Sequence, residues 1–407
     1  MYSHLQGLRV VEGSSFVAAP SCGLYLAQLG AEVIRFDQIG GGPDFRRWPK
    51  AESGASFYWE GLNKGKKSIA IDLRRPEGRE LALQLATAPG RGAGVFVTNY
   101  PAAGFLAHAK LVERRADQIT ARIMGWADGG NGVDYTINSA VGVPQMTGPA
   151  DSDEPVNHVL PAWDLLTGSL AALSVLAALR RREQTGRGEE IRVPLSDVAI
   201  SSLANLGQVG EVLVGGADRP RVGNDIFGAY GRDFVTSDGR RVMVAAISAR
   251  QWADLLSVLG IGEEIARMEE REGVSFSKDE GVRFEHRETL NALIGEAIAQ
   301  RSYADLKRAF DASAVCWGPY QSLHEAVTGD PRLVSANPLF SSIAHPSGHD
   351  YPAPGFAPTM SGAVRSPPRP APKLGENTEQ ILAEVLSYPA HEIARLHDDG
   401  IVASAAP

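Results

Sequence analysis

Cysteine is scarce in this chain: two of its 407 residues are cysteines, Cys22 and Cys316, and they lie far apart. This usage excludes a disulfide framework and a cysteine-based metal motif, and it is typical of a reducing cytoplasm. We therefore expect both thiols to be buried packing residues rather than nucleophiles.

An excess of positive charge is also lacking, because 48 Asp and Glu outnumber 40 Lys and Arg, for a formal net charge of -8. This balance argues against a nucleic-acid surface. The longest apolar stretch, residues 165–179, is interrupted by Thr167, Ser169 and Ser174 and is too short to cross a bilayer. The first residues lack the basic segment and apolar core of a secretion signal. We expect a soluble cytoplasmic protein without membrane or nucleic-acid partners.

The first 125 residues alternate between strand and helix patterns. Buried strands are predicted at residues 8–15, 32–37, 67–73 and 94–100, with helices at 19–31 and 76–87 between them. Short connections between such segments imply parallel pairing and right-handed crossovers. This part of the chain predicts a doubly wound α/β fold. Helical patterns dominate residues 165–213.

The pattern changes after residues 216–225. Two short strands around the turn at residues 237–239 predict an antiparallel hairpin, and amphipathic helices follow at 248–260 and 290–302. Residues 337–373 are rich in Pro, Gly and Ser and predict a long wrapping connection before closing helices at 376–388 and 390–402. The length also favours two domains. We predict a large domain at residues 1–223, a small α+β domain at 224–335, and a linker and C-terminal return at 336–407.

Two basic segments are candidates for binding an anion. The loop at residues 38–49 carries three glycines but matches neither dinucleotide nor P-loop spacing, and Pro43 prevents a helix from starting on the glycines. A nicotinamide cofactor is therefore disfavoured, although Arg46 and Arg47 remain available to phosphates or to solvent. Residues 61–78 gather Lys and Arg around one strand, which fits either an anionic ligand or a solvated sheet edge.

Asp164 is a single carboxylate between "VLPAW" and an almost wholly apolar run. It is either an N-cap for the following helix or a functional group, and the two roles are compatible. A carboxylate near a helix N-terminus is expected to stay ionised near pH 7 and to remain a usable nucleophile. Other chemistry is weakly supported, since His345 and His349 are separated by Pro346 and Gly348 and cannot share a helical face for metal binding. We expect no metal.

Five separated segments, running in order from residue 5 to about residue 402, together resemble the family III CoA transferases, also called the CaiB/BaiF family. They are residues 7–37, 63–85, 95–104, 160–199 and 374–388. The resemblance implies a Rossmann-like large domain built from both chain ends, an inserted smaller α+β domain, and an interlocked homodimer. It also implies catalysis through one aspartate, at the position of Asp164, which forms an aspartyl-CoA thioester by way of a mixed anhydride.

The same resemblance implies where coenzyme A binds as part of an acyl-CoA substrate, with no separate cofactor. Val17 and Ala18 follow the first strand, Ile71 and Arg74 match the segment that meets the adenosine and its phosphates, and Asn99 matches the loop beside the pantetheine arm. Val133 and Asp134 lie where the family approaches the thioester. Gln38 departs from the arginine that many members carry, which puts a phosphate contact there in doubt.

Within the family, residues 133–149, 156–168 and 218–234 resemble the mesaconyl-CoA C1–C4 CoA transferases, or 2-methylfumaryl-CoA isomerases. This resemblance implies CoA transfer between the two carboxyls of one substrate. Three alternatives stay open: CoA transfer to another acid, α-methylacyl-CoA racemisation, and simple acyl-CoA binding. Racemisation is disfavoured because Val133 occupies the place of the racemase histidine and cannot accept a proton.

Overall fold

The structure is a computed structural model that describes residues 1–405. The chain forms two compact units. The first combines Met1–Val141, His158–Val209 and the chain from Pro331, and the second combines Gly142–Asn157 with Gly210–Asp330. Residues 142–157 and 210–223, which the sequence analysis assigns to the large domain, belong to the second unit.

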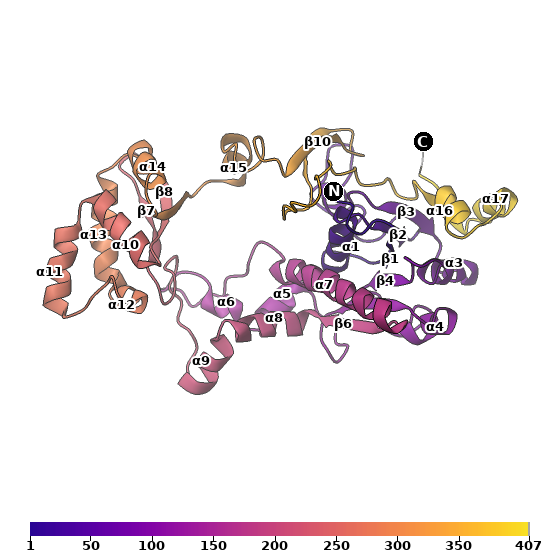
Figure 1. Cartoon of the computed structure of the whole chain (residues 1–407), viewed down its shortest axis with the longest axis horizontal. Helices are drawn as coiled ribbons and strands as arrows, with labels where there is room; N and C mark the ends of the chain where they lie inside the picture. The colour runs from indigo at the N-terminus through magenta and orange to yellow at the C-terminus, as the bar shows by residue number, and fades with distance from the viewer. Residues whose placement is uncertain (406–407) are drawn as a thin grey trace. The chain divides into compact units, whose positions relative to one another are not determined.

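The first unit is organised around a seven-stranded sheet with the order β12-β3-β2-β1-β4-β5-β6 (Figure 1). Its strands are β1 (Arg9–Gly13), β2 (Glu32–Asp37), β3 (Lys67–Ile71), β4 (Val95–Thr98), β5 (Ile119–Met124), β6 (Glu190–Pro194) and β12 (Val402–Ala403). All neighbouring strands are parallel except β12, which pairs antiparallel with β3. The predicted parallel α/β sheet is confirmed. Strand β6 lies in a stretch predicted to be helical, because its short sequence "EIRVP" is flanked by two long helices.

Helices cover both faces of this sheet, as expected for strands that are buried on both sides. One face packs against α1 (Ala18–Gln28), α7 (Ala162–Thr185) and α8 (Leu195–Asn205). The other packs against α3 (Pro76–Ala86), α4 (His108–Arg114), α16 (Thr378–Glu384) and α17 (Ala390–Asp398). Alternate residues of β1 divide between the two cores, Val10 facing the first and Val11 the second. The short helices α2 (Phe57–Leu62) and α5 (Asp134–Ala140) lie in connections.

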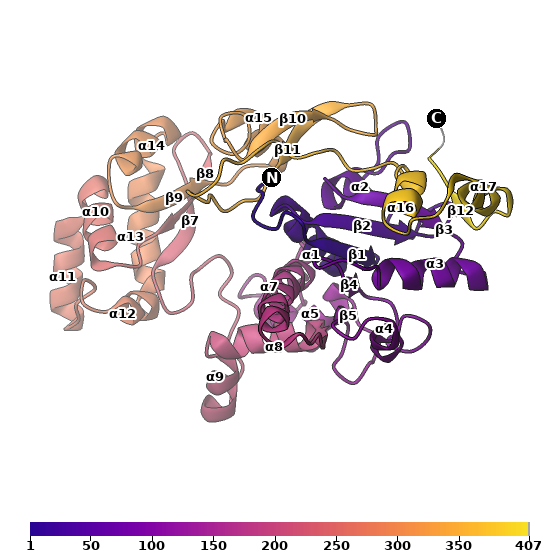
Figure 2. The same ribbon diagram turned by 45° about the vertical axis from the view of Figure 1, so that its right-hand side comes forward.

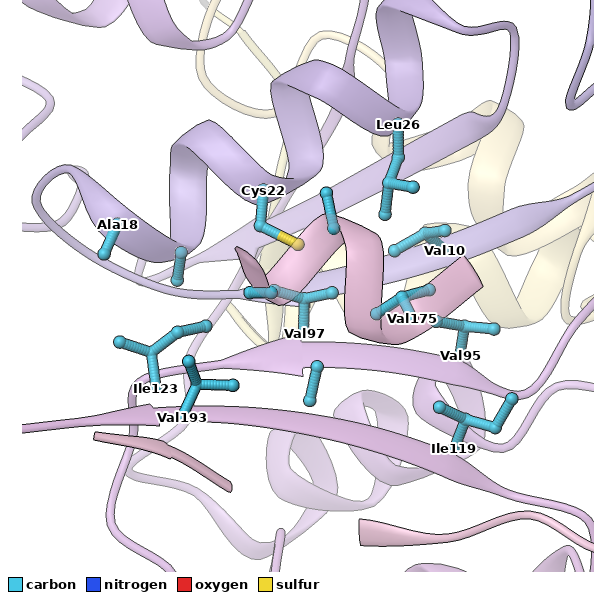
Figure 3. Packing of buried hydrophobic residues seen from close by; sticks show 14 of the residues in the cluster. Val10, Ala18, Cys22, Leu26, Val95, Val97, Ile119, Ile123, Val175 and Val193 are labelled. Carbon is cyan, nitrogen blue, oxygen red and sulfur yellow. The ribbon is translucent and has the colours of Figure 1, made fainter. Parts of the chain in front are cut away.

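Helices α1 and α7 pack closely in the first core. Figure 3 shows Cys22 and Leu26 of α1 packed together with Val175 of α7 and the strand residues Val10 and Val97. Cys22 is fully buried, as predicted. The prediction for Cys316 is wrong: it is exposed on an edge strand, β9 (Cys316–Pro319), where its Sγ accepts a hydrogen bond from Gln251 Nε2 at 3.0 Å.

Helix α7 is longer than the apolar run that predicts it. Its 24 residues make it long and apolar enough to cross a membrane by length and composition alone, a test that core helices also pass. Its buried residues Gly168, Ala171, Val175 and Ala178 are three or four positions apart, which is the spacing of one helical face. This face belongs to the core of the first unit.

The second unit contains a three-stranded antiparallel sheet, β7 (Gly231–Val235), β8 (Arg241–Ala245) and β9, which confirms the predicted hairpin. Its helices are α6 (Val143–Met146), α10 (Ala249–Leu259), α11 (Gly262–Glu272), α12 (Glu280–Glu285), α13 (Arg287–Ala299), α14 (Tyr303–Asp311) and α15 (Leu323–Gly329), and α9 (Gln208–Gly215) lies mostly within it. Helices α10 and α13 confirm the two amphipathic predictions.

The predicted structureless connection at residues 337–373 contains a hairpin. Strands β10 (Phe340–Ala344) and β11 (Asp350–Pro354) pair antiparallel within the first unit (Figure 2). Pro352 and Pro354 hide the strand pattern, since proline donates no ladder hydrogen bond and is tolerated only where none is needed. A two-stranded sheet consists of edge strands and offers such positions.

Candidate active site at the start of helix α7

The parallel sheet reverses its strand order between β1 and β4, and ligands bind at such a switch point, beyond the carboxyl ends of the strands. The loops that follow these two strands are tied together here. The Asn99 side chain accepts a hydrogen bond from the Ser15 backbone N–H at 3.0 Å and donates one to the Ser15 carbonyl at 2.8 Å. Asn99 therefore shapes the loop that leads into α1.

A buried ionic network contacts the backbone of the same loop through Arg35. Arg35 donates to the Ser14 carbonyl at 3.0 Å, to both carboxylate oxygens of Asp37 at 2.9 Å, and to Asp44 at 2.8 Å. Glu12 lies 2.8 Å from Lys66 and 3.4 Å from Arg35. Burial raises the pKa of Asp44 even beside Arg35. Paired charges of this kind are costly to break, so the network holds the loop in place.

Phe16 in this loop has a strained backbone conformation. It has a φ of 68°, a left-handed conformation that non-glycine residues adopt only when their surroundings enforce it. Its ring is 40% exposed and lies 5.5 Å from the guanidinium carbon of Arg47. The loop thus presents an apolar ring beside a cation at the switch point.

The start of α7 reaches the same edge of the sheet because α7 leads from the end of β5 toward the start of β6. Arg182, in its last turn, donates to the carbonyls of Ala93 and Gly94 at the opposite edge. The first turn therefore lies at the carboxyl ends of the strands. Asp164 is the third residue of this helix.

Asp164 is not the N-cap of α7. The N-cap is Pro161, which offers no side-chain acceptor. Instead, Asp134 in the first turn of α5 accepts a hydrogen bond from the Asp164 backbone N–H, with 3.0 Å between Oδ2 and N. The capping role that the sequence analysis gives to Asp164 thus belongs to a second carboxylate from another helix.

The Asp164 carboxylate itself is half-buried, and no hydrogen bond or ion pair to it is found within residues 1–405. Burial, and then the neighbouring charge of Asp134, raise its pKa to about 7, with Arg47 opposing them. The expectation that the helix end keeps it fully ionised near pH 7 is therefore wrong. The partial charge of one helix terminus does not offset desolvation and a like charge.

Two further side chains surround this carboxylate. Arg47 lies 5.4 Å from the Tyr58 ring, and no acidic partner for it is found in the described chain. The Tyr58 hydroxyl is buried and finds no hydrogen-bond partner among residues 1–405, and burial raises its pKa well above the usual value. The sequence analysis leaves Arg47 available to phosphates or to solvent, and no sequence signal singles out Tyr58.

His158 is a second residue that the sequence analysis misses. Its Nε2 lies 2.6 Å from Asp134 Oδ1, so Asp134 is shared between His158 and the backbone of Asp164. Sequence spacing gives no reason to pair residues 134 and 158, because α5 and the segment before α7 meet only in the fold.

The predicted coenzyme contacts fall into two groups. Asp134 is buried beside Asp164, and Val133 precedes it with 53% of its surface exposed. Val17 and Ala18 are buried at the start of α1, near Asn99 in the chain fold. Ile71 is the last residue of β3, which lies two strands away from β1, and Arg74 follows this strand.

These two residues offer very different surfaces to a ligand. Ile71 is fully buried in the second core, which leaves only its backbone available. Arg74 is 82% exposed and forms an ion pair with Asp72 at 2.8 Å. In the part of the chain that the structure describes, no group of three or more His, Cys, Asp or Glu side chains is arranged to hold a metal ion.

The chain resembles characterised proteins over nearly its whole length. Residues 5–378 match the family model described as CoA-transferase family III. The chain is 47% identical over 400 residues to a 2-methylfumaryl-CoA isomerase of Chloroflexus aurantiacus, covering 98% of each chain. It is 29% identical to the succinyl-CoA:glutarate CoA-transferase of Homo sapiens, covering 98% of this chain and 90% of that protein.

Solved structures agree with these sequence relatives. A CAIB/BAIF family protein from Brucella suis superposes with a TM-score of 0.76 at 28% identity, covering 95% of this chain and all of the other. The likeness thus extends over the sheet, both of its helical layers and the segments around Asp164. The chain belongs to CoA-transferase family III.

Proposed function

We propose that the protein moves CoA between the C1 and C4 carboxyls of mesaconyl-CoA (2-methylfumaryl-CoA), with Asp164 as the nucleophile. The observation that carries this proposal is a half-buried carboxylate near Arg47 at the switch point of the sheet, for which residues 1–405 supply no hydrogen-bond or ion-pair partner. The relative at 47% identity, a 2-methylfumaryl-CoA isomerase, supports the choice of substrate.

The chemistry conserves the activated acyl group. An Asp164 carboxylate oxygen attacks the C1 thioester carbonyl, the carbon–sulfur bond breaks, and a mixed anhydride and CoA thiolate result. The thiolate then attacks the Asp164 carbonyl carbon, which forms aspartyl-CoA and releases the C1 carboxylate. The C4 carboxylate attacks the aspartyl-CoA carbonyl, the carbon–sulfur bond breaks, and a mixed anhydride between C4 and Asp164 forms as CoA thiolate leaves. The thiolate finally takes the C4 acyl group and frees Asp164.

Each attack by a carboxylate requires that carboxylate to be ionised and water to be kept away. Burial of the Asp164 carboxylate serves the second requirement, and the same burial raises the pKa of Asp164. A reaction carried by a carboxylate and a thiolate alone uses no metal, and coenzyme A enters only as part of the substrate.

Arg47 is the group suited to the free carboxylate of the dicarboxylic substrate. Its guanidinium lies over the rings of Phe16 and Tyr58, and it forms no ion pair with an acidic side chain of residues 1–405. Guanidinium groups bind carboxylates in two-point geometry. If Arg47 holds the free carboxylate of the substrate, the five-carbon acyl group lies between Arg47 and Asp164. When the substrate turns end over end, its other carboxyl faces Asp164.

We further propose the assembly and ligand contacts that family membership suggests. Val17, Ala18, Asn99, Val133 and Asp134 would line the path of the CoA arm, and Ile71 and Arg74 would meet its adenosine end. The protein would act as an interlocked homodimer in the cytoplasm.

Incubation with mesaconyl-C1-CoA, followed by chromatographic separation of the two regioisomers, tests the function directly. Conversion to the C4 isomer is expected from the wild-type protein and not from an Asp164→Ala variant. Binding of the ester without conversion would identify an acyl-CoA-binding protein. Conversion that requires an added free acid would identify an intermolecular CoA transferase.

A further inference from the structure

Asp134 contacts two other residues of the candidate site, His158 and Asp164. One of its carboxylate oxygens lies 2.6 Å from His158 Nε2, and the other accepts the Asp164 backbone N–H at 3.0 Å. Asp134 is 1% exposed, whereas 22% of the His158 side chain is exposed. Asp134 therefore links His158, at the edge of the site, to the backbone of the proposed nucleophile.

This arrangement creates an electrostatic problem. A buried carboxylate beside Asp164 disfavours ionisation of Asp164, yet the proposed reaction needs Asp164 as an anion. The titratable and charged groups that face Asp164 are Arg47 from the loop after β2, Tyr58 from α2, and Asp134 from α5. Tyr58 is neutral, so Arg47 alone would have to balance two carboxylates.

We propose that His158 is a positioning residue which, as an imidazolium ion paired with Asp134, lets Asp134 hold the start of α7 while Asp164 remains an anion. This inference rests on the proposed function of Asp164. His158 need not touch the substrate, because it acts through the carboxylate that it shares with the Asp164 backbone.

The neighbouring aromatic side chains fix the imidazole in this role. The Tyr135 ring meets it edge-on at 5.7 Å, and the Trp163 ring lies 6.4 Å away at a tilt of 49°. Trp163 precedes Asp164 in the chain and donates from its indole N–H to Asn138 Oδ1 at 2.9 Å. The histidine therefore has one well-defined orientation, with Nε2 toward Asp134.

The first test measures the charge on His158 in the wild-type protein without substrate. Nitrogen-15 NMR of labelled histidine distinguishes imidazolium from neutral imidazole, and carbon-13 NMR of labelled aspartate follows the Asp164 carboxyl, assigned with an Asp164→Asn sample. We expect His158 to be imidazolium at the pH at which Asp164 is ionised. A neutral His158 at that pH would overturn the proposal, even if the enzyme isomerises mesaconyl-CoA.

The second test uses His158→Gln, which keeps an N–H donor for Asp134 but cannot carry charge. We expect the acidic limb of kcat/KM to move up by about one pH unit, hence about tenfold lower kcat/KM on that limb, with little loss above pH 9. His391→Gln, at an exposed histidine of α17, is the matched control and should match wild type. A loss that is the same at every pH, or no loss, contradicts the proposal.

The two proposals fail in different ways. If the wild-type protein does not isomerise mesaconyl-CoA, the proposed function fails, while the NMR titrations still report the charges on His158 and Asp164. If the wild-type protein isomerises the ester and His158→Gln has an unchanged pH profile, only the role of His158 is wrong.

Discussion

A β-carbon at Gly168 of α7 would lie 2.7 Å from the Ala18 carbonyl oxygen and 2.7 Å from the Ser21 β-carbon of α1. Glycine at this position therefore lets the two helices approach to backbone contact. Asp164 lies one turn before Gly168, and Ala18 follows the loop that carries Phe16. The position of the proposed nucleophile relative to that loop thus depends on the absence of one methyl group.

Gly168→Ala is expected to separate α7 from α1 and to displace Asp164. Overpacking of this kind costs about 1–3 kcal/mol, and a small misplacement of a nucleophile reduces kcat by about 100-fold. Urea unfolding and steady-state kinetics measure the two effects. Gly210→Ala in α9 is a suitable control, because a β-carbon there meets nothing within 4 Å. Wild-type kcat in Gly168→Ala would show that the close approach does not position Asp164.

Asp164→Asn should abolish CoA transfer but stabilise the folded protein above pH 7. The native pKa of Asp164 is about 7, against 3.8 in a model compound. Between these values the unfolded chain has lost a proton that the native protein retains, so stability falls as pH rises. The penalty at pH 8 is at most about 4 kcal/mol, and asparagine removes it. Urea unfolding should show equal stability of both proteins near pH 4 and a more stable variant at pH 8; a less stable variant at pH 8 contradicts the burial argument.

The pH dependence of catalysis should follow the same carboxyl group. Attack on the thioester requires ionised Asp164, whose pKa is about 7 because of burial and the charge of Asp134. We expect kcat/KM for mesaconyl-C1-CoA to rise with pH through about 7 and then to level off. A profile that stays flat between pH 5 and 8 would show that Asp164 titrates at its ordinary value.

Arg47→Gln is expected to weaken binding of the dicarboxylic ester. Loss of a charged hydrogen bond to a carboxylate costs about 1.5–3 kcal/mol, which corresponds to a KM about 10- to 100-fold higher. Arg47→Lys should recover part of this loss, since lysine keeps the charge but not the planar two-point geometry. Arg91→Gln, in an exposed loop, is the control. An unchanged KM in Arg47→Gln would remove Arg47 from the binding site.

The sequence is sufficient to predict the parts of this architecture that depend on local pattern. Alternating strand and helix signals predict β1 to β4, α1 and α3, and "LPAWDLL" directs attention to Asp164. The sequence does not predict contacts between segments that are distant along the chain. The pairing of Asp134 with His158, and the approach of Arg47 and Tyr58 to Asp164, depend on how loops meet at the edge of the sheet. Local propensity contains no information about such tertiary contacts. The sequence therefore could not predict that Asp134 caps α7.

Transfer of CoA is expected to stay within one substrate molecule. Once aspartyl-CoA has formed, the released dicarboxylate lies beside the thioester, and effective molarities for such oriented groups reach about 10⁵ M or more. No cellular pool of free acid competes at that level. Isotope-labelled mesaconate, added with unlabelled mesaconyl-C1-CoA, should therefore not enter the CoA ester during isomerisation. Mass spectrometry of the separated regioisomers measures its entry. Label that appears as fast as the C4 isomer would show exchange with external acid, with Asp164 still the nucleophile of an intermolecular transferase.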